Sequence, residues 1–134
     1  MWKFVACLVS VALLVGACGS DDPEPAGIVK LLAPVDYQAA VAADDVFVVN
    51  VHIPYEGEIE GTDVFIPFDD VEAYADDLPL DKDAPLYVYC RSGRMSAEVT
   101  PDLQALGYTN IIDLEGGMEA WEDAGLAIIR REQS

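Results

Sequence analysis

Residues 86–96 read LYVYCRSGRMS: four apolar or aromatic residues, a cysteine, a short polar loop with a glycine, and the beginning of a helix-like segment. The apolar run is continuous rather than alternating, which is typical of a strand covered on both faces. Two similar runs occupy residues 46–51 (VFVVNV) and 109–114 (TNIIDL). Because helix-like segments separate these runs, the sequence predicts an α/β domain of three layers, with a central, mainly parallel sheet flanked by helices.

Four segments have the composition of helices, and they are residues 36–43, 69–78, 95–106 and 118–124. Gly107 and Gly125 follow two of them and are good helix stops. Pro101 lies inside the third, where it should cost about 3 kcal/mol in an unbroken helix. We therefore expect a kink, or two short helices, in that segment.

Cys90 ends the run LYVYC and so lies at the carboxyl end of a predicted central strand, where α/β sheets bind their ligands. Gly93 lets the loop curl, so that successive backbone N–H groups point inward as an anion-binding nest at the start of a helix. Arg91, Arg94 and the helix dipole favour the thiolate form of Cys90. The alternative is a buried structural cysteine followed by a surface turn.

The loop CRSGRMS resembles the active-site loop of single-domain rhodaneses, which are sulfurtransferases. Residues 106–126 (LGYTNIIDLEGGMEAWEDAGL) are similar to the closing pattern of that family: a G-[FY] strand, L-x-G-G, a tryptophan and A-G-[LF]. The resemblance covers about residues 28–129 and implies a rhodanese-like fold. By their own chemistry, Gly116 and Gly117 supply a tight turn between strand and helix, and Trp121 belongs to the core.

The resemblance implies transfer of sulfane sulfur. The Cys90 thiolate would take the outer sulfur of a small anionic donor such as thiosulfate and hold it as a persulfide. It would then pass the sulfur to a thiol or cyanide-like acceptor, and the sequence does not say whether a protein is the acceptor. Inward N–H groups of the loop would stabilise the persulfide without a general base. The residues expected to bind the donor or the persulfide are Arg91, Ser92, Gly93, Arg94, Met95 and Ser96. No cofactor and no metal site is expected, because few soft ligands remain.

An upstream motif departs from the family. Typical rhodaneses carry D-x-R at the end of an early strand and then G-H-I-x-G-A, whereas this chain has Asn50-Val51-His52 and, at residues 57–62, GEIEGT. The Asp is replaced by Asn50, the Arg by His52 and the His by Glu58. In the family these charges support the active-site loop, so their loss predicts weaker binding of thiosulfate.

His52 is the only histidine of the chain, and we expect its strand to end beside the strand that ends at Cys90. Our hypothesis is that His52 replaces part of the missing arginine, so that anion binding depends on pH around 6.5, where histidine changes charge. The alternative is a satisfied histidine at a strand end. Glu56, Glu58 and Glu60 are interpreted as a solvated acidic loop. The alternative is that they lie near the mouth of the site, where they would repel small anions and favour another kind of donor.

The first 17 residues contain 14 apolar ones. The apolar run that follows Lys3 is too short to cross a bilayer comfortably as a helix. Because the segment is apolar all round rather than amphipathic, it is typical of a secretory signal peptide and not of a core helix. The following VGAC resembles the lipobox of bacterial lipoproteins, which implies cleavage after Ala17 and acylation of Cys18, for example with palmitate. A plain secreted protein with a free Cys18 is the alternative. The sequence thus predicts a signal peptide (residues 1–17), a lipidated tether (18–27) and one domain (28–134), anchored to the bacterial cell membrane outside the cytoplasm.

Processing would leave Cys90 as the only thiol and exclude an intramolecular disulfide. With 7 basic and 25 acidic residues, the net charge of −18 argues against a nucleic-acid partner and against a basic membrane-surface helix. It predicts a solvated acidic surface around a small cationic centre at Arg91 and Arg94.

Two other functions compete with sulfur transfer. Cysteine phosphatases and arsenate reductases also cradle an anion beside a cysteine, but phosphatases place an arginine six positions after it, where this chain has Ser96. The second alternative is a non-catalytic, lipid-anchored module that binds a partner or senses sulfide and persulfide. The changes at Asn50, His52 and Glu58 favour that module, whereas the intact Cys90 favours the enzyme.

Overall fold

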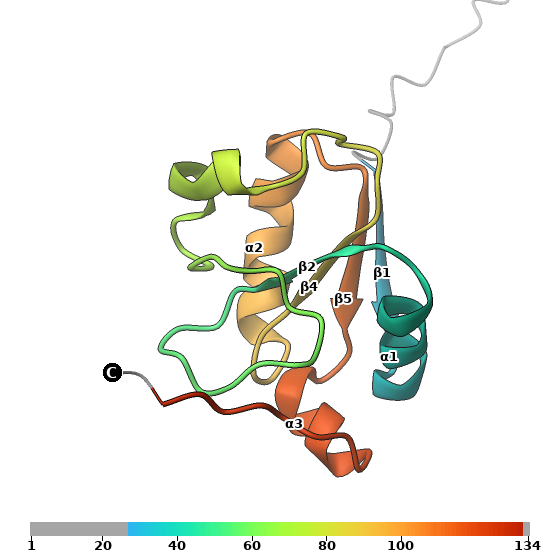
Figure 1. Ribbon diagram of the computed structural model, residues 1–134. Coiled ribbons are helices and arrows are strands. Elements are labelled where there is room, and N and C mark those ends of the chain that lie inside the picture. The colour runs from blue at the N-terminus through green and yellow to red at the C-terminus, as the bar shows by residue number, and fades with distance from the viewer. Residues whose placement is uncertain (1–26, 133–134) are drawn as a thin grey trace, which may run out of the picture.

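The computed structural model describes residues 27–132, which contain one five-stranded sheet (Figure 1). All its strand pairs are parallel, and the strand order is β1-β5-β4-β2-β3. The elements are β1 (Ile28–Leu32), α1 (Pro34–Ala43), β2 (Phe47–Asn50), β3 (Val64–Phe65), the 3-10 helix η1 (Val71–Asp77), β4 (Leu86–Tyr89), α2 (Arg94–Ala105), β5 (Asn110–Leu114) and α3 (Gly117–Asp123).

Helices cover both faces of the sheet, with α2 and α1 on opposite sides (Figure 1). One core cluster joins Val88 and Ile111 of the sheet to Val99 and Leu103 of α2. The other joins the alternate strand residues, such as Ile112, to α1 and α3. The predicted three-layer α/β class with a parallel sheet is confirmed.

The central strands are buried on both faces, as their continuous apolar runs predict. Every residue of β4 is buried, and β4 is hydrogen-bonded to β2 on one side and β5 on the other. The sequence did not reveal the two edge strands. In β1 the side chains of Ile28 and Leu31 are exposed, and β3 has only two residues, so neither strand gives a buried pattern.

The segment around Pro101 differs from the prediction, because α2 runs unbroken from residue 94 to 105. Pro101 lies on the exposed face of the helix, where water can take over the carbonyl that the missing N–H leaves unpaired. The segment 69–78 also differs, since η1 is a 3-10 helix with a break at Tyr74. The Asp70 side chain makes no capping hydrogen bond to it, and Val71 is its one buried residue.

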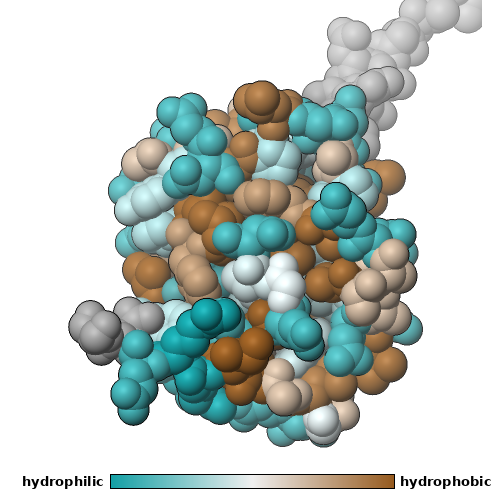
Figure 2. Space-filling view, in the orientation of Figure 1, coloured by the Kyte–Doolittle hydropathy of each residue, from teal (hydrophilic) through white to brown (hydrophobic). Residues whose placement is uncertain are grey.

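The predicted signal peptide, Cys18 and most of the tether lie outside the described residues. Within residues 27–132, no helix is long and apolar enough to cross a membrane. Hydrophilic and hydrophobic side chains are intermixed on the face seen in Figure 2.

Candidate active site

Cys90 follows β4 directly, at the carboxyl end of the sheet, and its side chain is 1% exposed. The chain then turns through Gly93, whose φ of 96° is left-handed, into α2. This turn brings the Gly93 N–H onto the Cys90 Sγ at 3.0 Å. The Ser96 hydroxyl, in the first turn of α2, lies 3.5 Å from the same sulfur. The predicted curled loop is present, and it provides the sulfur with a backbone donor.

The turn between β5 and α3 holds this loop from behind. Gly116 and Gly117 both have positive φ, as the predicted tight turn requires. The Met118 N–H donates to the Cys90 carbonyl, and the Glu119 N–H donates to the Arg91 carbonyl, each at 2.9 Å. A Cβ on Gly117 would lie 2.5 Å from the Arg91 carbonyl carbon and oxygen. The two motifs quoted from the sequence are therefore one structural unit, and Gly117 allows their close approach.

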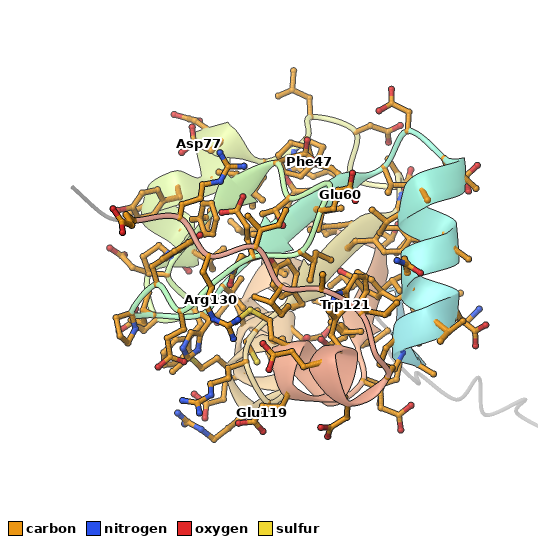
Figure 3. The ribbon with its side chains drawn as sticks, turned by 60° about the horizontal axis from the view of Figure 1, so that its bottom comes forward. Phe47, Glu60, Asp77, Glu119, Trp121 and Arg130 are labelled. Carbon is orange, nitrogen blue, oxygen red and sulfur yellow. The ribbon has the colours of Figure 1, made fainter. Side chains whose placement is uncertain are left out.

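A small open cavity of about 370 Å³ lies over the sulfur. It brings together most of the residues that the sequence proposed for the site, and its lining consists of His52, Cys90, Arg91, Ser92, Arg94, Met95 and Glu119. Gly93 and Ser96 contact the sulfur itself rather than the cavity. Glu119 was not among the predicted residues. Figure 3 shows it at the outer side of α3, whereas Trp121 is packed inside, as expected.

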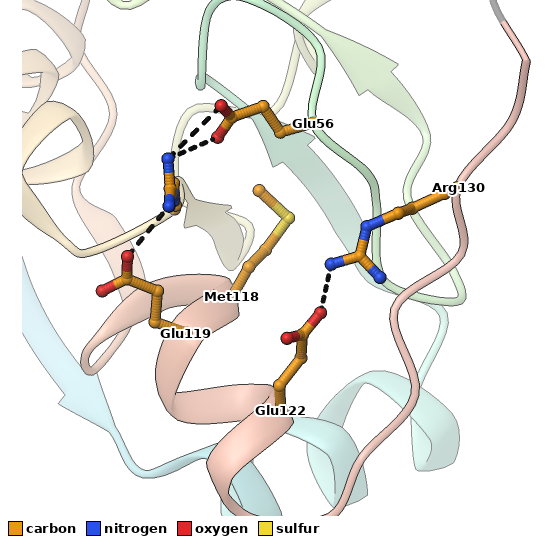
Figure 4. Close-up of a pocket in the computed structure, with 6 residues that line it drawn as sticks. Glu56, Met118, Glu119, Glu122 and Arg130 are labelled. Carbon is orange, nitrogen blue, oxygen red and sulfur yellow. Dashed lines mark hydrogen bonds and ion pairs between the residues drawn. The ribbon is translucent and has the colours of Figure 1, made fainter.

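The predicted cationic centre is neutralised by carboxylates. Arg91 contacts Glu56 and Glu119, at 3.1 Å in each case. Figure 4 shows these two carboxylates on opposite sides of the group that they contact. Arg94 contacts Glu98 one turn along α2, at 2.9 Å. The sequence shows two arginines within four positions of the sulfur. Glu56 and Glu119 are distant from Arg91 in the sequence, and only the fold brings them into contact with it. The mouth of the site is therefore close to balanced in charge rather than positive.

A second cavity, of about 390 Å³, lies beside the first and shares Arg91 and Glu119 with it. Its far wall is formed by Arg130, which pairs with Glu122 (Figure 4). Met118 supplies the apolar floor between these ion pairs. The two cavities form one shallow, charge-lined surface next to Cys90.

His52 lies at the edge of the Cys90 cavity with its side chain 8% exposed. The Val51 N–H donates to the Tyr89 carbonyl at 2.9 Å, so the strand that leads to His52 ends beside the strand that leads to Cys90, as predicted. The His52 Nε2 lies 2.8 Å from Glu56, and the His52 N–H donates to the Asn50 side chain at 2.9 Å. His52 and Arg91 therefore share one carboxylate.

Glu58 was expected in a solvated acidic loop, and this is wrong. Its side chain is 7% exposed and accepts hydrogen bonds from Arg131 at 2.9 Å and from the Tyr55 hydroxyl at 3.0 Å. Its backbone pairs with Ile129 in an isolated antiparallel bridge. The carboxylate thus tolerates burial because both its oxygens have partners. Glu60 is exposed, as expected.

Sequence reasoning missed Asp113, which interrupts the apolar run of β5 and is 3% exposed. Burial raises the pKa of Asp113 to about 6, although hydrogen bonding to Ser96 and to the Leu114 backbone acts in the opposite direction. One of its carboxylate oxygens, Oδ1, has no hydrogen-bond partner. The signal was present in the sequence, since an acid within a strand predicted to be buried on both faces needs an explanation.

The parallel sheet, the cysteine loop at its carboxyl edge and the double-glycine turn behind it define a rhodanese-like domain. The chain belongs to the rhodanese-like domain family, whose model matches residues 44–124. A curated relative, named a sulfurtransferase, from Allochromatium vinosum is 31% identical over 98 residues, which cover 71% of this chain and 89% of that protein.

Solved structures agree with this assignment. A rhodanese-related protein from Thermoplasma volcanium has a TM-score of 0.63 at 26% identity, covering 75% of this chain and 97% of the other. A protein from Rhodopseudomonas palustris, described as a possible tyrosine phosphatase, has a TM-score of 0.62 at 27% identity, covering 75% and 84%. The fold and the family of the chain are therefore established.

Proposed function

We propose that this protein is a sulfurtransferase in which Cys90 carries sulfane sulfur as a persulfide. The observation that carries the proposal is the Cys90 sulfur itself, buried below an open cavity and 3.0 Å from the Gly93 N–H. A backbone donor at this place stabilises negative charge on sulfur without needing a metal or a cofactor. Membership of a family with a sulfurtransferase relative supports the same reaction.

The reaction has two halves. In the first, the Cys90 thiolate attacks the outer sulfur of a donor such as thiosulfate; a new S–S bond forms, the donor's S–S bond breaks, and sulfite leaves with the electron pair. In the second, a thiol or cyanide attacks the outer sulfur of the persulfide, and the Cys90 thiolate is released. Ser92, Arg94 and Met95, which line the cavity, are the residues that would contact the donor.

The donor preferred by this site carries little negative charge. Glu56 and Glu119 form ion pairs with Arg91, and Glu98 forms an ion pair with Arg94. The two arginines therefore attract a dianion only weakly. A thiol persulfide brings less charge to the mouth than thiosulfate does. We therefore expect persulfides to be better donors than thiosulfate.

The test is a mass spectrum of the full chain after incubation with thiosulfate or with a small-molecule persulfide. We expect an adduct of about 32 Da, one sulfur, on the peptide that contains Cys90. A Cys90→Ser variant is the control and should remain unmodified. Absence of the adduct with every donor, or an equal adduct in the variant, would overturn the proposal.

A non-catalytic module that binds a partner or senses persulfide is the second candidate, and the ion pairs of Arg91 favour it. A cyanide-coupled assay separates the two. Turnover that depends on Cys90 supports the enzyme, whereas a stable persulfide without turnover supports the sensor.

A phosphatase is less well supported, although one similar structure is described as a possible tyrosine phosphatase. Phosphate transfer needs an arginine that grips the phosphate from the end of the loop, and the place six residues after Cys90 is held by Ser96. Arg94, two residues earlier, contacts Glu98 at 2.9 Å.

We also propose that the domain is exported and anchored by lipid at Cys18, on the basis of the sequence pattern at residues 1–18. Labelling of cells with a fatty acid such as palmitate tests this. The label should enter the wild type and a Cys7→Ala control but not a Cys18→Ala variant. Equal labelling of the Cys18→Ala variant, or no labelling of the wild type, would contradict the anchor.

A further inference from the structure

A third cavity, of about 620 Å³, borders the Cys90 cavity at His52, which lines both of them. Its remaining wall comes from residues between 53 and 67, from Tyr74 of η1 and from Arg131. Sites that bind small organic molecules have volumes of about 300–1,000 Å³. The transfer proposed for Cys90 makes no use of this cavity, although the cavity adjoins the site.

Aromatic and aliphatic side chains form much of its wall, and we call it the aromatic cavity. Tyr55, Phe65 and Tyr74 supply the rings, and Ile53 and Ile66 supply aliphatic groups. The rings of Tyr55 and Phe65 meet edge to face, with 5.4 Å between their centroids. Phe65 is 43% exposed, Tyr74 38% and Ile53 36%. Large apolar side chains that gather at the surface are typical of ligand-binding grooves.

Main-chain hydrogen bonds hold this wall against the sheet. The Ile66 N–H donates to the Asn50 carbonyl at 3.0 Å, and the Phe68 N–H donates to the Val51 carbonyl at 3.2 Å. The chain that carries Phe65 therefore follows β2 to the end of the strand, where the route to His52 begins. The cavity is built on the same sheet edge as the sulfur site.

The acid and the base in the wall neutralise each other. Glu58 accepts hydrogen bonds at both carboxylate oxygens, from the Arg131 side chain at 2.9 Å and from the Tyr55 hydroxyl at 3.0 Å. The Tyr55 hydroxyl also accepts a hydrogen bond from the Arg131 main-chain N–H at 3.2 Å. An ion that entered the cavity would lose its water beside groups that are already paired. An uncharged organic group therefore fits the cavity better than an ion does.

We propose that the aromatic cavity binds the organic part of the thiol that accepts sulfur from Cys90, and that this part is an uncharged aromatic group. The ring lies among Tyr55, Phe65 and Tyr74, and the sulfur of the thiol reaches the Cys90 cavity past His52. The inference rests on the proposed function and deepens it, because it names the chemical class of the acceptor.

The transfer step then has a defined course. The thiolate of the acceptor attacks the outer sulfur of the Cys90 persulfide and forms a new S–S bond with it. The bond between that sulfur and the Cys90 Sγ breaks, and Cys90 leaves as a thiolate with the electron pair. The proton on the transferred sulfur stays with it, so the product is the persulfide of the aromatic thiol.

The experiment compares two thiols that share a two-carbon link to sulfur, 2-phenylethanethiol and 2-mercaptoethanol. The full chain is first loaded with sulfur at Cys90, and mass spectrometry follows the rate at which each thiol removes the adduct. Because burial of a phenyl group is favourable, 2-phenylethanethiol should react about tenfold faster or more at equal low concentration. Equal rates in the wild type would overturn the proposal.

Variants of the cavity locate the ring. Phe65→Leu and Tyr74→Leu each remove one exposed ring but keep an apolar side chain, and each should lower the ratio of the two rates by roughly 2- to 10-fold, the value of one aromatic contact. Leu80→Ala is the matched control, because Leu80 is 96% exposed and is not part of the wall. The control should keep the ratio of the wild type. A ratio that is the same in all four proteins would overturn the proposal.

A binding measurement leaves the rings unaltered and so guards against misfolded variants. In the Cys90→Ser protein, 2-phenylethanol, which has no thiol, should shift the ring resonances of Tyr55, Phe65 and Tyr74 more than those of the buried Tyr108. Equal shifts, or none, would overturn the proposal. Binding without transfer of sulfur to either thiol would contradict the proposed function, whereas transfer without binding at these rings would contradict this inference alone.

Discussion

The Glu56 carboxylate lies 3.1 Å from the Arg91 guanidinium, although the two residues are 35 positions apart in the sequence. The same carboxylate lies 2.8 Å from His52. One acidic residue of the loop after β2 therefore contacts both Arg91 and His52, two of the basic side chains that line the Cys90 cavity. This arrangement explains why the arginine-rich loop does not make a strongly positive site.

Removal of the Glu56 charge should improve the use of thiosulfate. In Glu56→Gln, Arg91 and His52 are released toward the cavity, so the KM for thiosulfate should fall while kcat changes little. Exposed ion pairs are worth about 0.2–1 kcal/mol, which corresponds to roughly a 1.5- to 5-fold change in KM. Cyanide-coupled kinetics at low salt measure it, with the exposed Glu60→Gln as control. A KM that rises, or that falls equally in the control, would contradict this role of Glu56.

Substitution of His52 by arginine should strengthen the binding of anions. In His52→Arg a permanent positive charge replaces the imidazole at the edge of the Cys90 cavity. The KM for thiosulfate should fall by roughly 1.5- to 5-fold, if the gain matches the value of one exposed ion pair, about 0.2–1 kcal/mol. Cyanide-coupled kinetics check it. An unchanged KM would show that His52 is only a satisfied residue at a strand end.

Gly117→Ala should disrupt the cysteine loop. A Cβ there would lie 2.5 Å from the Arg91 carbonyl, and the φ of 63° is strained for any other residue. Gly125→Ala is the matched control, since its φ is 81° but no atom lies within 4 Å of the added Cβ. The left-handed strain should cost each variant about 1–2 kcal/mol.

The clash should add to that cost in Gly117→Ala alone, by about 1–3 kcal/mol. Urea unfolding measures both variants, and alkylation of Cys90 should be impaired only in Gly117→Ala. Equal stability losses would show that the close approach of the two loops is not required.

The buried Asp113 should make stability fall as the pH rises. Its pKa is raised from 3.8 to about 6 in the folded protein, so the folded state holds the proton more tightly than the unfolded state. The stabilisation from protonated Asp113 is complete below about pH 4 and is lost as the pH rises through about 6. The free energy of unfolding of the wild type, compared with that of Asp113→Asn at each pH, isolates this effect from the rest of the acidic surface.

The expected change in that difference is on the order of 2–3 kcal/mol between pH 4 and 7 in favour of the variant at the higher pH. A constant difference would contradict the raised pKa.

Much of the fold and of the sulfur site could be predicted because the information is local. The run before Cys90, the glycine at position 93 and the double glycine at 116–117 each specify a strand end or a turn within a few residues. The edge strand β1 was missed because its exposed side chains give no pattern of burial. The unbroken α2 was missed because the cost of Pro101 depends on which face of the helix it occupies.

The electrostatics of the site were not predictable in the same way. Glu56 reaches Arg91 from the loop after β2 and Glu119 reaches it from α3, and Glu58 is neutralised by Arg131, 73 residues further along the chain. A count of the charges near Cys90 in the sequence therefore predicted a positive site, whereas the site in the folded protein is close to balanced in charge. The buried Asp113 was visible as an acid in an apolar strand, but its proximity to Ser96 required the packing of α2 on the sheet.

The cysteine loop and the α3 turn are joined by main-chain atoms, through the Met118 and Glu119 N–H groups and the carbonyls of Cys90 and Arg91. A bond of this kind does not depend on the side chains that flank it. Arg91 and Glu119 can therefore each be replaced by another residue without displacing the nucleophile, provided that Gly117 is kept. Natural variation can thus change the charge at the entrance, and with it the choice of donor, while the placement of the sulfur is inherited unchanged.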